Sequence, residues 1–470
     1  MIFNSFQFIW LFPLIFAAYW AASRFSSKGS GIAKYLLLVV SYGVYAQWSL
    51  AFASVLLLVT ALTYFGARAL ESRPNLRTPI IYISVLATLA PLLLFKYFNF
   101  ITEAGASALA WIGIDTPPAR LSWVVPLGLS FYTFQALGYL WDVYRHQLKA
   151  ERNWWDYMLF VSYFPQLLCG PISKASELLP QLKAHRDFDY SRAVSGLRMV
   201  LWGMFLKVVI ADRAGLYVDT VYGDFSAYTG TTLLVASLMY TLQIYGDFAG
   251  YSYIAVGVSR LLGIDLIVNF RRPYLAQSVS GFWRRWNISL TRWLTTYVYI
   301  PLGGSRRGRG RTYGNIMITF LVSGLWHGAN FTFILWGALH GVAQVIEKAL
   351  GINKIESRGI LRLIRILVTV AIVNLGWILF RSPSVAEAFD YIGRIFTWGS
   401  LYVDTKTFAH VAAGLAVMAA VEIWMEFGPR GFRRFLGCSR TLRWAAYIAL
   451  TLMILTMGVL DSGQFIYVQF

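Results

Sequence analysis

Long apolar segments recur along the whole of this 470-residue chain, and they limit what it can fold into. Hydrophobic residues make up 57% of the sequence and charged residues only 13%. Ordinary soluble domains are about 45–50% apolar and about 25% charged, so a single water-soluble core does not account for this composition. Many of the runs approach the ~20 residues that a helix needs to cross a bilayer. The sequence therefore predicts an all-α, polytopic integral membrane protein.

The apolar runs predict roughly 11–12 transmembrane helices within a single membrane-embedded domain over 1–470. The sequence contains no internal repeat, low-complexity tract or soluble domain. The run at 315–347 is long enough to contain a break. The candidate spans are 6–23, 35–49, 51–67, 79–97, 122–141, 194–211, 231–246, 248–264, 315–347, 361–380, 407–426 and 443–461.

The net charge of +19 comes from basic residues clustered in short loops between the apolar runs. This distribution is typical of orientation signals and of contacts with anionic lipid headgroups, and it argues against nucleic-acid binding. The loops at 24–34, 68–77, 348–365 and 430–443 are basic, whereas 381–406 is balanced. Placing the basic loops in the cytoplasm puts both termini on the opposite side of the membrane.

Three stretches depart from regular spanning helices. Pro165 and Pro171 interrupt the apolar run at 157–173, and a proline removes a backbone donor and clashes with the preceding turn. This pattern fits either a re-entrant or kinked segment that lines an internal cavity, or an ordinary proline-kinked helix. The stretch at 282–299 has arginines among aromatic residues, which indicates a helix at headgroup level. The stretch at 383–398 is a weaker amphipathic candidate.

Two of the five histidines, His327 and His340, lie in apolar contexts rich in glycine and tryptophan. An ionisable residue at membrane depth indicates a function by default. The alternative is a buried, neutral imidazole that a backbone carbonyl satisfies. We favour function for His327 and the structural alternative for His340. His146 and His185 lie in polar stretches typical of solvated loops.

The residues around His327 fit a catalytic role. Gly324, Gly328 and Ala329 leave room beside the ring, and the amide of Asn330, three residues on, can hold it. A neutral histidine can take a proton from a hydroxyl group during acyl transfer. The sequence therefore predicts that His327 is a general base.

Other polar features leave alternatives open. Asp247 stands at a predicted break between two apolar runs and is flanked by glycines, where it fits either a functional acid or a cap on the following helix. The arginines of the basic loop at 303–311 suit phosphates, of lipids or of coenzyme A, and also suit an ordinary cytoplasmic loop. The positions of Cys169 and Cys438 and the scattered histidines predict neither a disulfide framework nor a metal site.

Four segments together resemble a known family. They are FWRRWNISLTRWLTTYVYIPLGGSRRG at 282–308, SGLWHGANFTFILWGALHG at 323–341, FPQLLCGPISKASELLPQL at 164–182 and YGDFAGYSYIAVG at 245–257. They are similar to the membrane-bound O-acyltransferase (MBOAT) superfamily, in particular to its bacterial polysaccharide branch, the alginate O-acetyltransferase membrane subunits. The most recognisable core covers 120–345.

This resemblance implies a ring of helices, with re-entrant and interfacial helices, around a central cavity. It implies O-acetyltransferase activity that moves an acetyl group from a cytoplasmic donor, expected to be acetyl-CoA, toward an exported polysaccharide. His327 matches the essential histidine of the family. The second catalytic position falls on Asn287, where the alginate branch usually carries histidine. Asparagine can orient a reactant but cannot exchange protons at neutral pH, so His327 remains the base.

The same resemblance suggests further expectations about binding and location. Acetyl-CoA is the expected donor, with no permanently bound cofactor and no metal. The expected partners are a periplasmic acetyltransferase- or esterase-like protein, the polysaccharide acceptor and membrane lipids. The expected location is the bacterial inner membrane, with both termini periplasmic. The residues expected to contact the donor are Arg284, Arg285, Arg306, Arg307, Trp326 and Asn330.

Two alternatives remain open at this stage. One is a D-alanyl or lipid acyltransferase of the same superfamily. The other is a non-enzymatic transporter or scaffold subunit, although the internal repeat that many transporters carry is not found in the sequence.

Overall fold

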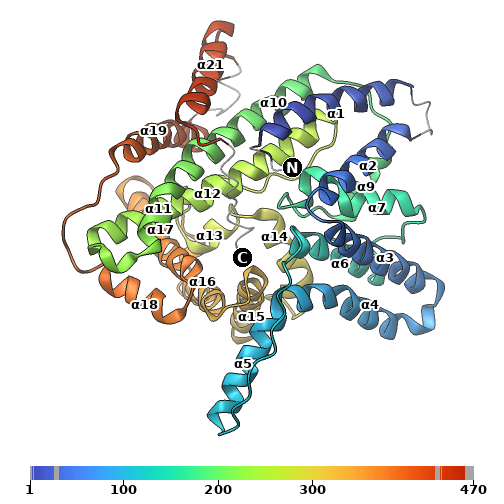
Figure 1. The fold of residues 1–470 in the computed structure, drawn as a ribbon, viewed down its shortest axis with the longest axis horizontal. Coiled ribbons are helices and arrows are strands. Elements are labelled where there is room, and N and C mark those ends of the chain that lie inside the picture. Colours follow the sequence, from blue (N-terminus) through green and yellow to red (C-terminus); the bar gives the residue numbers. More distant parts are fainter. Residues whose placement is uncertain (1–2, 4, 26–30, 429–434, 436, 461–470) are drawn as a thin grey trace.

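The computed structural model describes residues 3, 5–25, 31–428, 435 and 437–460. All regular structure in these residues is helical, and the prediction of an all-α fold is confirmed. Figure 1 shows the helices arranged around a central region, with α5 (Phe98–Trp111) and α21 (Arg440–Met457) projecting at opposite edges. The other α-helices are α1 (Phe6–Phe25), α2 (Ile32–Ala46), α3 (Leu50–Ser72), α4 (Arg77–Leu92), α6 (Leu129–Tyr144), α7 (Trp154–Ser162), α8 (Phe164–Leu167), α9 (Ala175–Lys183), α10 (Tyr190–Met204), α11 (Asp212–Gly223), α12 (Gly230–Leu261), α13 (Val279–Trp283), α14 (Ile288–Leu294), α15 (Arg309–His327), α16 (Phe331–Ala349), α17 (Gly359–Arg381), α18 (Val385–Arg394) and α19 (Thr405–Phe427). Within the described residues, three segments are π-helical: η2 (Leu93–Tyr97), η3 (Phe205–Ala211) and η6 (Thr295–Tyr299).

Six helical segments of the described residues are long and apolar enough to cross a membrane. Each contains one of the predicted spans, and the shorter apolar helix α2 overlaps the prediction at 35–49. The chain ends at 1–2 and 461–470 lie outside the described residues, so the periplasmic location of the termini stays a prediction. The six segments are Phe6–Arg24, Leu50–Ser72, Pro74–Trp111, Tyr190–Gly223, Gly359–Arg381 and Thr405–Phe427.

The spans predicted at 231–246 and 248–264 form one 32-residue helix, α12, so the predicted break at Asp247 is wrong. The glycines that suggested a break are points where helices touch. A Cβ atom on Gly250 would lie 2.7 Å from the carbonyl oxygen of Gly203 in α10. Small residues at such positions let helix backbones approach closely in membrane proteins.

Asp247 consequently caps no helix. Its carboxylate pairs with the ammonium group of Lys207 at 2.5 Å, and Lys207 also bonds Asp212 at 2.6 Å. All three side chains are 3% exposed. Removing one partner of a buried ion pair typically costs about 3–5 kcal/mol, so this cluster ties α12 firmly to the η3 turn.

The proline-containing segment at 157–173 is a broken helix inside the protein. α7 ends at Ser162, α8 lasts a single turn, and the chain is not helical from Leu168 to Lys174. Pro165 lies in the first turn of α8, where its missing N–H group is tolerated. The cavity-lining alternative is confirmed, because Leu168 and Cys169 line a cavity.

The prediction of one helix over 282–299 is wrong, and its location at headgroup level stays a prediction. The segment forms α13, a turn, α14 and η6, and its residues Phe282, Trp283 and Trp286 are buried in the core. Glu347 of α16 holds α13 in place, because its carboxylate accepts the N–H groups of Val279 at 2.5 Å and Ser280 at 2.9 Å. A carboxylate at this position also complements the positive end of a helix dipole.

The other comparisons with the predictions are local. The run at 122–141 is helical only from Leu129. The run at 315–347 contains the break that its length allows, because it is divided into α15 and α16. The amphipathic candidate at 383–398 contains α18, which buries Ala388 and Tyr391. His146 and His185 are exposed, as predicted.

Candidate active site

α15 and α16 form a tight helical hairpin whose turn carries His327. α15 ends at His327, three residues form the turn, and α16 begins at Phe331. Glycines bring the two helices together: a Cβ atom on Gly324 would lie 2.2 Å from the carbonyl oxygen of Phe333. A Cβ atom on Gly337 would lie 2.4 Å from the carbonyl oxygen of Phe320. The close crossing leaves His327 only 4% exposed.

Aromatic side chains surround the imidazole of His327. Its ring centroid lies 4.8 Å from that of Trp326, 4.9 Å from that of Trp336 and 5.3 Å from that of Phe380. All three contacts are edge-on. The ring is therefore held between α15, α16 and the end of α17.

A cavity of about 270 Å³, here called the basic cavity, lies between α13, α14, α15 and α16. Arg284 and Lys348 bring positive charge to its lining. Trp283 also lines it, and the Trp283 ring lies 5.4 Å from that of Trp336, which contacts His327. A pair of tryptophans thus connects the basic cavity to the histidine.

A second cavity, of about 450 Å³ and here called the acidic cavity, lies beside the end of α17. Phe380 contacts His327, and the residues that directly follow it, from Arg381 to Pro383, line this cavity. Arg381 is paired with Asp219 at 2.8 Å. The remaining lining residues are Tyr222, Gly223, Phe225, Glu387 and Tyr391.

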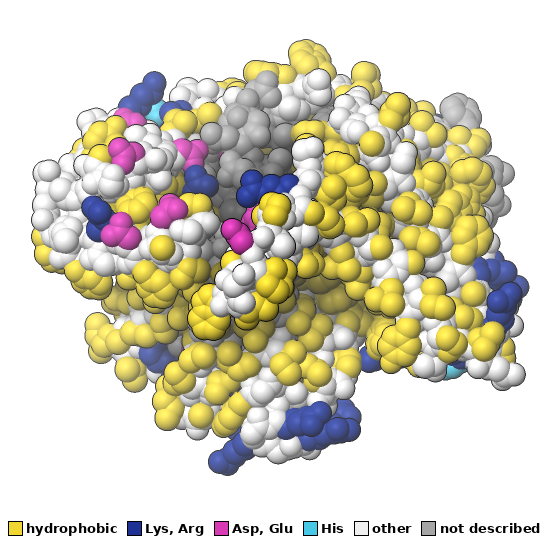
Figure 2. Space-filling model, turned by 60° about the horizontal axis from the view of Figure 1, so that its bottom comes forward, with side chains coloured by type: hydrophobic (Ala, Val, Ile, Leu, Met, Phe, Trp, Pro, Cys, Tyr) yellow, Lys and Arg dark blue, Asp and Glu magenta, His cyan; other side chains and the backbone are white. Residues whose placement is uncertain are grey.

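The two cavities lie toward opposite ends of α17. Lys348 and Asn353 of the basic cavity precede the start of this helix, whereas Arg381 of the acidic cavity is its last residue. A helix of 23 residues is about 34 Å long, which is enough to cross a bilayer. Figure 2 shows acidic side chains gathered at the upper left together with Lys and Arg, whereas the charged clusters along the lower and right edges are Lys and Arg. His327 therefore lies between two cavities of different charge.

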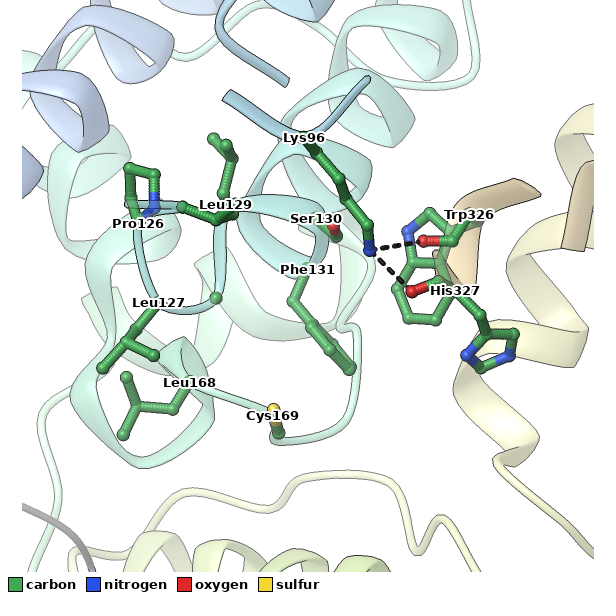
Figure 3. Close-up of a pocket in the computed structure, with 12 residues that line it drawn as sticks. Lys96, Pro126, Leu127, Leu129, Ser130, Phe131, Leu168, Cys169, Trp326 and His327 are labelled. Carbon is green, nitrogen blue, oxygen red and sulfur yellow. Dashed lines mark hydrogen bonds between the residues drawn. The ribbon is translucent and has the colours of Figure 1, made fainter. Parts of the chain in front are cut away.

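A small cavity of about 50 Å³ reaches His327 from a third direction. Figure 3 shows Lys96, Phe131, Cys169, Trp326 and His327 around it. The ammonium group of Lys96 donates to the carbonyl oxygens of Trp326 at 3.0 Å and His327 at 2.7 Å. Trp326, a predicted donor contact, therefore lines a space directly beside the histidine.

His340 is fully buried, as the structural alternative predicts, although its partner is an indole. Trp283 Nε1–H donates to His340 Nδ1 at 3.3 Å, and a neutral ring with an acceptor at Nδ1 carries its proton at Nε2. Trp336 lies between the two histidines, with its centroid 5.0 Å from that of His340. His340 thus contacts both Trp283 and Trp336, the pair that connects the basic cavity to His327.

Asn287 occupies the turn between α13 and α14 in a left-handed conformation, with φ 41° and ψ 56°. Asparagine tolerates this conformation better than most residues. Its side chain is fully buried, and neither atom of its amide has a hydrogen-bond partner among the described residues. Such a group requires an explanation, and a bound reactant is one.

The other predicted donor contacts lie in different places. Arg284 lines the basic cavity, but Arg285 pairs with Glu426 of α19 at 2.9 Å. Arg306 and Arg307 are exposed in the turn before α15. The prediction that Asn330 holds the ring of His327 is wrong, because its amide accepts the N–H group of Thr332 and donates to Pro383. The reason is that Asn330 caps the start of α16.

The sequence did not predict three residues of the site. Lys348 belongs to a basic loop of the kind that faces the cytoplasm, and no sequence pattern indicated a role for Glu347 beside it. Lys96 carried a signal, because it is a charged residue within the apolar run at 79–97, and such residues indicate function.

The MBOAT family model, for the membrane-bound O-acyltransferase family, matches residues 152–354. The chain is 36% identical over 441 residues to the probable alginate O-acetylase AlgI of Pseudomonas syringae pv. tomato, covering 93% of this chain and 82% of that protein. It is 32% identical over 419 residues to the peptidoglycan O-acetyltransferase of Helicobacter pylori, covering 83% and 78%. It is 26% identical over 271 residues to the teichoic acid D-alanyltransferase of Bacillus subtilis, covering 55% and 65%.

The chain therefore belongs to the membrane-bound O-acyltransferase family. It is a multi-pass integral membrane acyltransferase, similar to the bacterial polysaccharide O-acetyltransferase branch. Asn287 and the whole α15–α16 hairpin lie inside the matched region, whereas Lys96 lies outside it.

A pair of substitutions separates the two roles that Asn287 can have. Asn287→Gly keeps the left-handed backbone and removes the amide, whereas Asn287→Ala removes the amide and strains the backbone. If the amide contacts a reactant, both variants lose about 10²-fold of the acyl-transfer rate, the scale of losing one positioned donor. Only Asn287→Ala should also melt at a lower temperature. Full activity in Asn287→Gly would show that this residue serves the turn alone.

Proposed function

We propose that the chain is a membrane O-acetyltransferase that takes an acetyl group from acetyl-CoA for the O-acetylation of an exported polysaccharide, with His327 as general base. The observation that carries this proposal is the position of His327 between the basic and acidic cavities. The similarity to proteins named for alginate and peptidoglycan O-acetylation supports the acetyl group and the glycan class.

The basic cavity suits the donor. Arginine and lysine bind phosphate groups, which coenzyme A carries, and Arg284 and Lys348 provide them here. Under the positive-inside rule the neighbouring basic loops face the cytoplasm, where acetyl-CoA is made. Arg306 and Arg307 remain candidates for lipid phosphates, because they are exposed in the same basic loop.

The acidic cavity suits the acceptor side. Its aromatic rings and its polar groups match the mixed surface of a sugar or of a partner's hydroxyl-bearing side chain. Tyr222 and Tyr391 stack at 4.6 Å, which gives the cavity a rigid aromatic wall. We assign this side to the periplasm of a bacterial inner membrane, where a partner acetyltransferase would receive or use the acetyl group.

The reaction follows from this arrangement. A ring nitrogen of His327 takes the proton from the acceptor hydroxyl, whose oxygen attacks the thioester carbonyl carbon. The carbon–sulfur bond then breaks, and the coenzyme A thiolate leaves with the proton that the imidazole held. Asn287 can orient the thioester through its amide, which has no other partner among the described residues.

The space beside His327 favours a short acyl group. A water-sized group needs about 10–15 Å³ on this measure, and the small cavity of about 50 Å³ holds only a few such groups. An acetyl group is small enough for that space. D-alanyl transfer is the second candidate, because one relative carries that name over a shorter and less similar stretch.

Replacing His327 by alanine tests the chemistry. The purified protein in nanodiscs should release coenzyme A from acetyl-CoA when a polysaccharide acceptor and the periplasmic partner are present. His327→Ala should lower this rate about 10²–10⁴-fold, the usual contribution of a general base. His185→Ala is the control, since this histidine is exposed in a loop. Equal rates in the wild type and His327→Ala would contradict the assignment.

The arginines should differ in their effect on the donor. Arg284→Ala removes a charge from the basic cavity and should raise KM for acetyl-CoA, with a smaller change in kcat. Arg306→Ala removes an equal charge from the exposed turn. Because salt screens an exposed charge, KM for acetyl-CoA should stay within about twofold of the wild-type value. Steady-state kinetics over a range of acetyl-CoA concentrations makes the comparison. A larger effect in Arg306→Ala would move the donor site to the turn.

A further inference from the structure

The last carbonyl groups of α15 have unusual partners. The final carbonyls of a helix have no partner within it and need other donors. The Tyr97 hydroxyl donates to the carbonyl oxygen of Leu325 at 2.6 Å, and the Lys96 ammonium donates to those of Trp326 and His327. Two adjacent side chains thus bind three successive carbonyls at the point where α15 ends (Figure 3 shows the two bonds of Lys96).

The π-helical turn η2 explains how two adjacent residues reach the same place. η2 joins α4 to α5 over Leu93–Tyr97, directly after Pro91 and Leu92. A π-turn widens the helix and redirects its side chains, and such turns occur frequently at functional sites. Here the turn directs both Lys96 and Tyr97 at the end of α15.

A lysine is costly at this position. Lys96 is partly buried and lies within the apolar segment Pro74–Trp111, a candidate membrane span. Among the described residues it forms no ion pair, so carbonyl dipoles and the negative end of α15 are what compensate its charge. A charge in such a segment usually marks a function.

The chemistry of the ammonium group fits this position. It has three donors, so one side chain can bind two carbonyls and keep a third donor available. Lys96 and His327 line the same small cavity, which also holds Trp326. The tyrosine hydroxyl, with one donor, binds only the preceding carbonyl.

We infer that Lys96 is a positioning residue for acyl transfer: by binding the carbonyls of Trp326 and His327 it fixes the end of α15 and the direction of the His327 ring. This inference rests on the proposed role of His327. A displacement of about 1 Å at a reacting group can reduce a rate about 10²-fold, so a residue that fixes the base has a large effect without touching the substrate.

The test compares three variants in nanodiscs. Lys96→Met removes the donors and the charge and should lower kcat about 10²-fold, with KM for acetyl-CoA changed less than about twofold. Lys96→Arg restores donors and should recover most of the rate. Tyr97→Phe is the matched control, because it removes one bond to the preceding carbonyl and should cost only a few-fold.

Two readouts distinguish positioning from general damage to the fold. In the His327→Ala background, Lys96→Met should lower the residual rate no further, since both changes act through the same group. Hydrogen–deuterium exchange should rise at the end of α15 and the start of α16 in Lys96→Met and stay unchanged in α10 and α12. The exchange measurement needs no substrate, so it decides on Lys96 even if acetyl-CoA is the wrong donor.

Two results would overturn the inference. One is a Lys96→Met protein with wild-type kcat and wild-type exchange at the end of α15. The other is a further large loss of rate when Lys96→Met is added to His327→Ala, because an effect independent of the histidine would mean that Lys96 acts elsewhere.

Discussion

The close approach of α15 and α16 is the constraint on which the rest of the site depends. Gly324 and Gly337 let the backbones of the two helices touch, and no larger residue fits there. Lipid tails are as apolar as the surfaces of the helices, so the hydrophobic effect does not bring membrane helices together. Close packing of this kind holds them together instead. The hairpin in turn places His327 at its bend and Glu347 at its other end, where Glu347 holds α13 and its tryptophan.

The site joins two differently charged cavities through an aromatic layer. A charged or polar molecule cannot cross a bilayer unaided, because desolvation is too costly. The layer formed by Trp283, Trp336 and Phe380 separates the two cavities. Each cavity lies one or two side chains away from His327. This arrangement allows a group to pass from one reactant to another without an open channel. It also fits the proposed role of His327 as a base inside a cage of aromatic side chains.

The sequence predicted the histidine but not its surroundings. The glycines beside the histidine predicted room around its ring, and Phe333 of α16 fills the space at Gly324 and Gly328. The break predicted at Asp247 was wrong for the same reason, because glycines in a membrane helix mark a close helix contact as readily as a break. Local sequence cannot distinguish these two uses, since the contacting carbonyls belong to another helix.

Long-range contacts explain the other differences. Arg284 and Arg285 are neighbours in the sequence, but a short helix and a turn direct one into the basic cavity and the other to Glu426. Lys96 binds carbonyls 230 and 231 residues away in the chain, and no pattern near it indicates that partner. Periodicity describes which face of a helix is apolar, whereas these contacts depend on which helices meet.

The measurement that tests this account most directly is the side from which each cavity can be reached. In a background with Cys169→Ala and Cys438→Ser, Lys348→Cys reports on the basic cavity and Glu387→Cys on the acidic cavity. A membrane-impermeant maleimide is added to right-side-out and to inside-out vesicles, and labelling after detergent is the control. The account predicts that Lys348→Cys reacts only in inside-out vesicles and Glu387→Cys only in right-side-out ones. Labelling of both from the same side would contradict it, because His327 would then not lie between the two faces of the membrane.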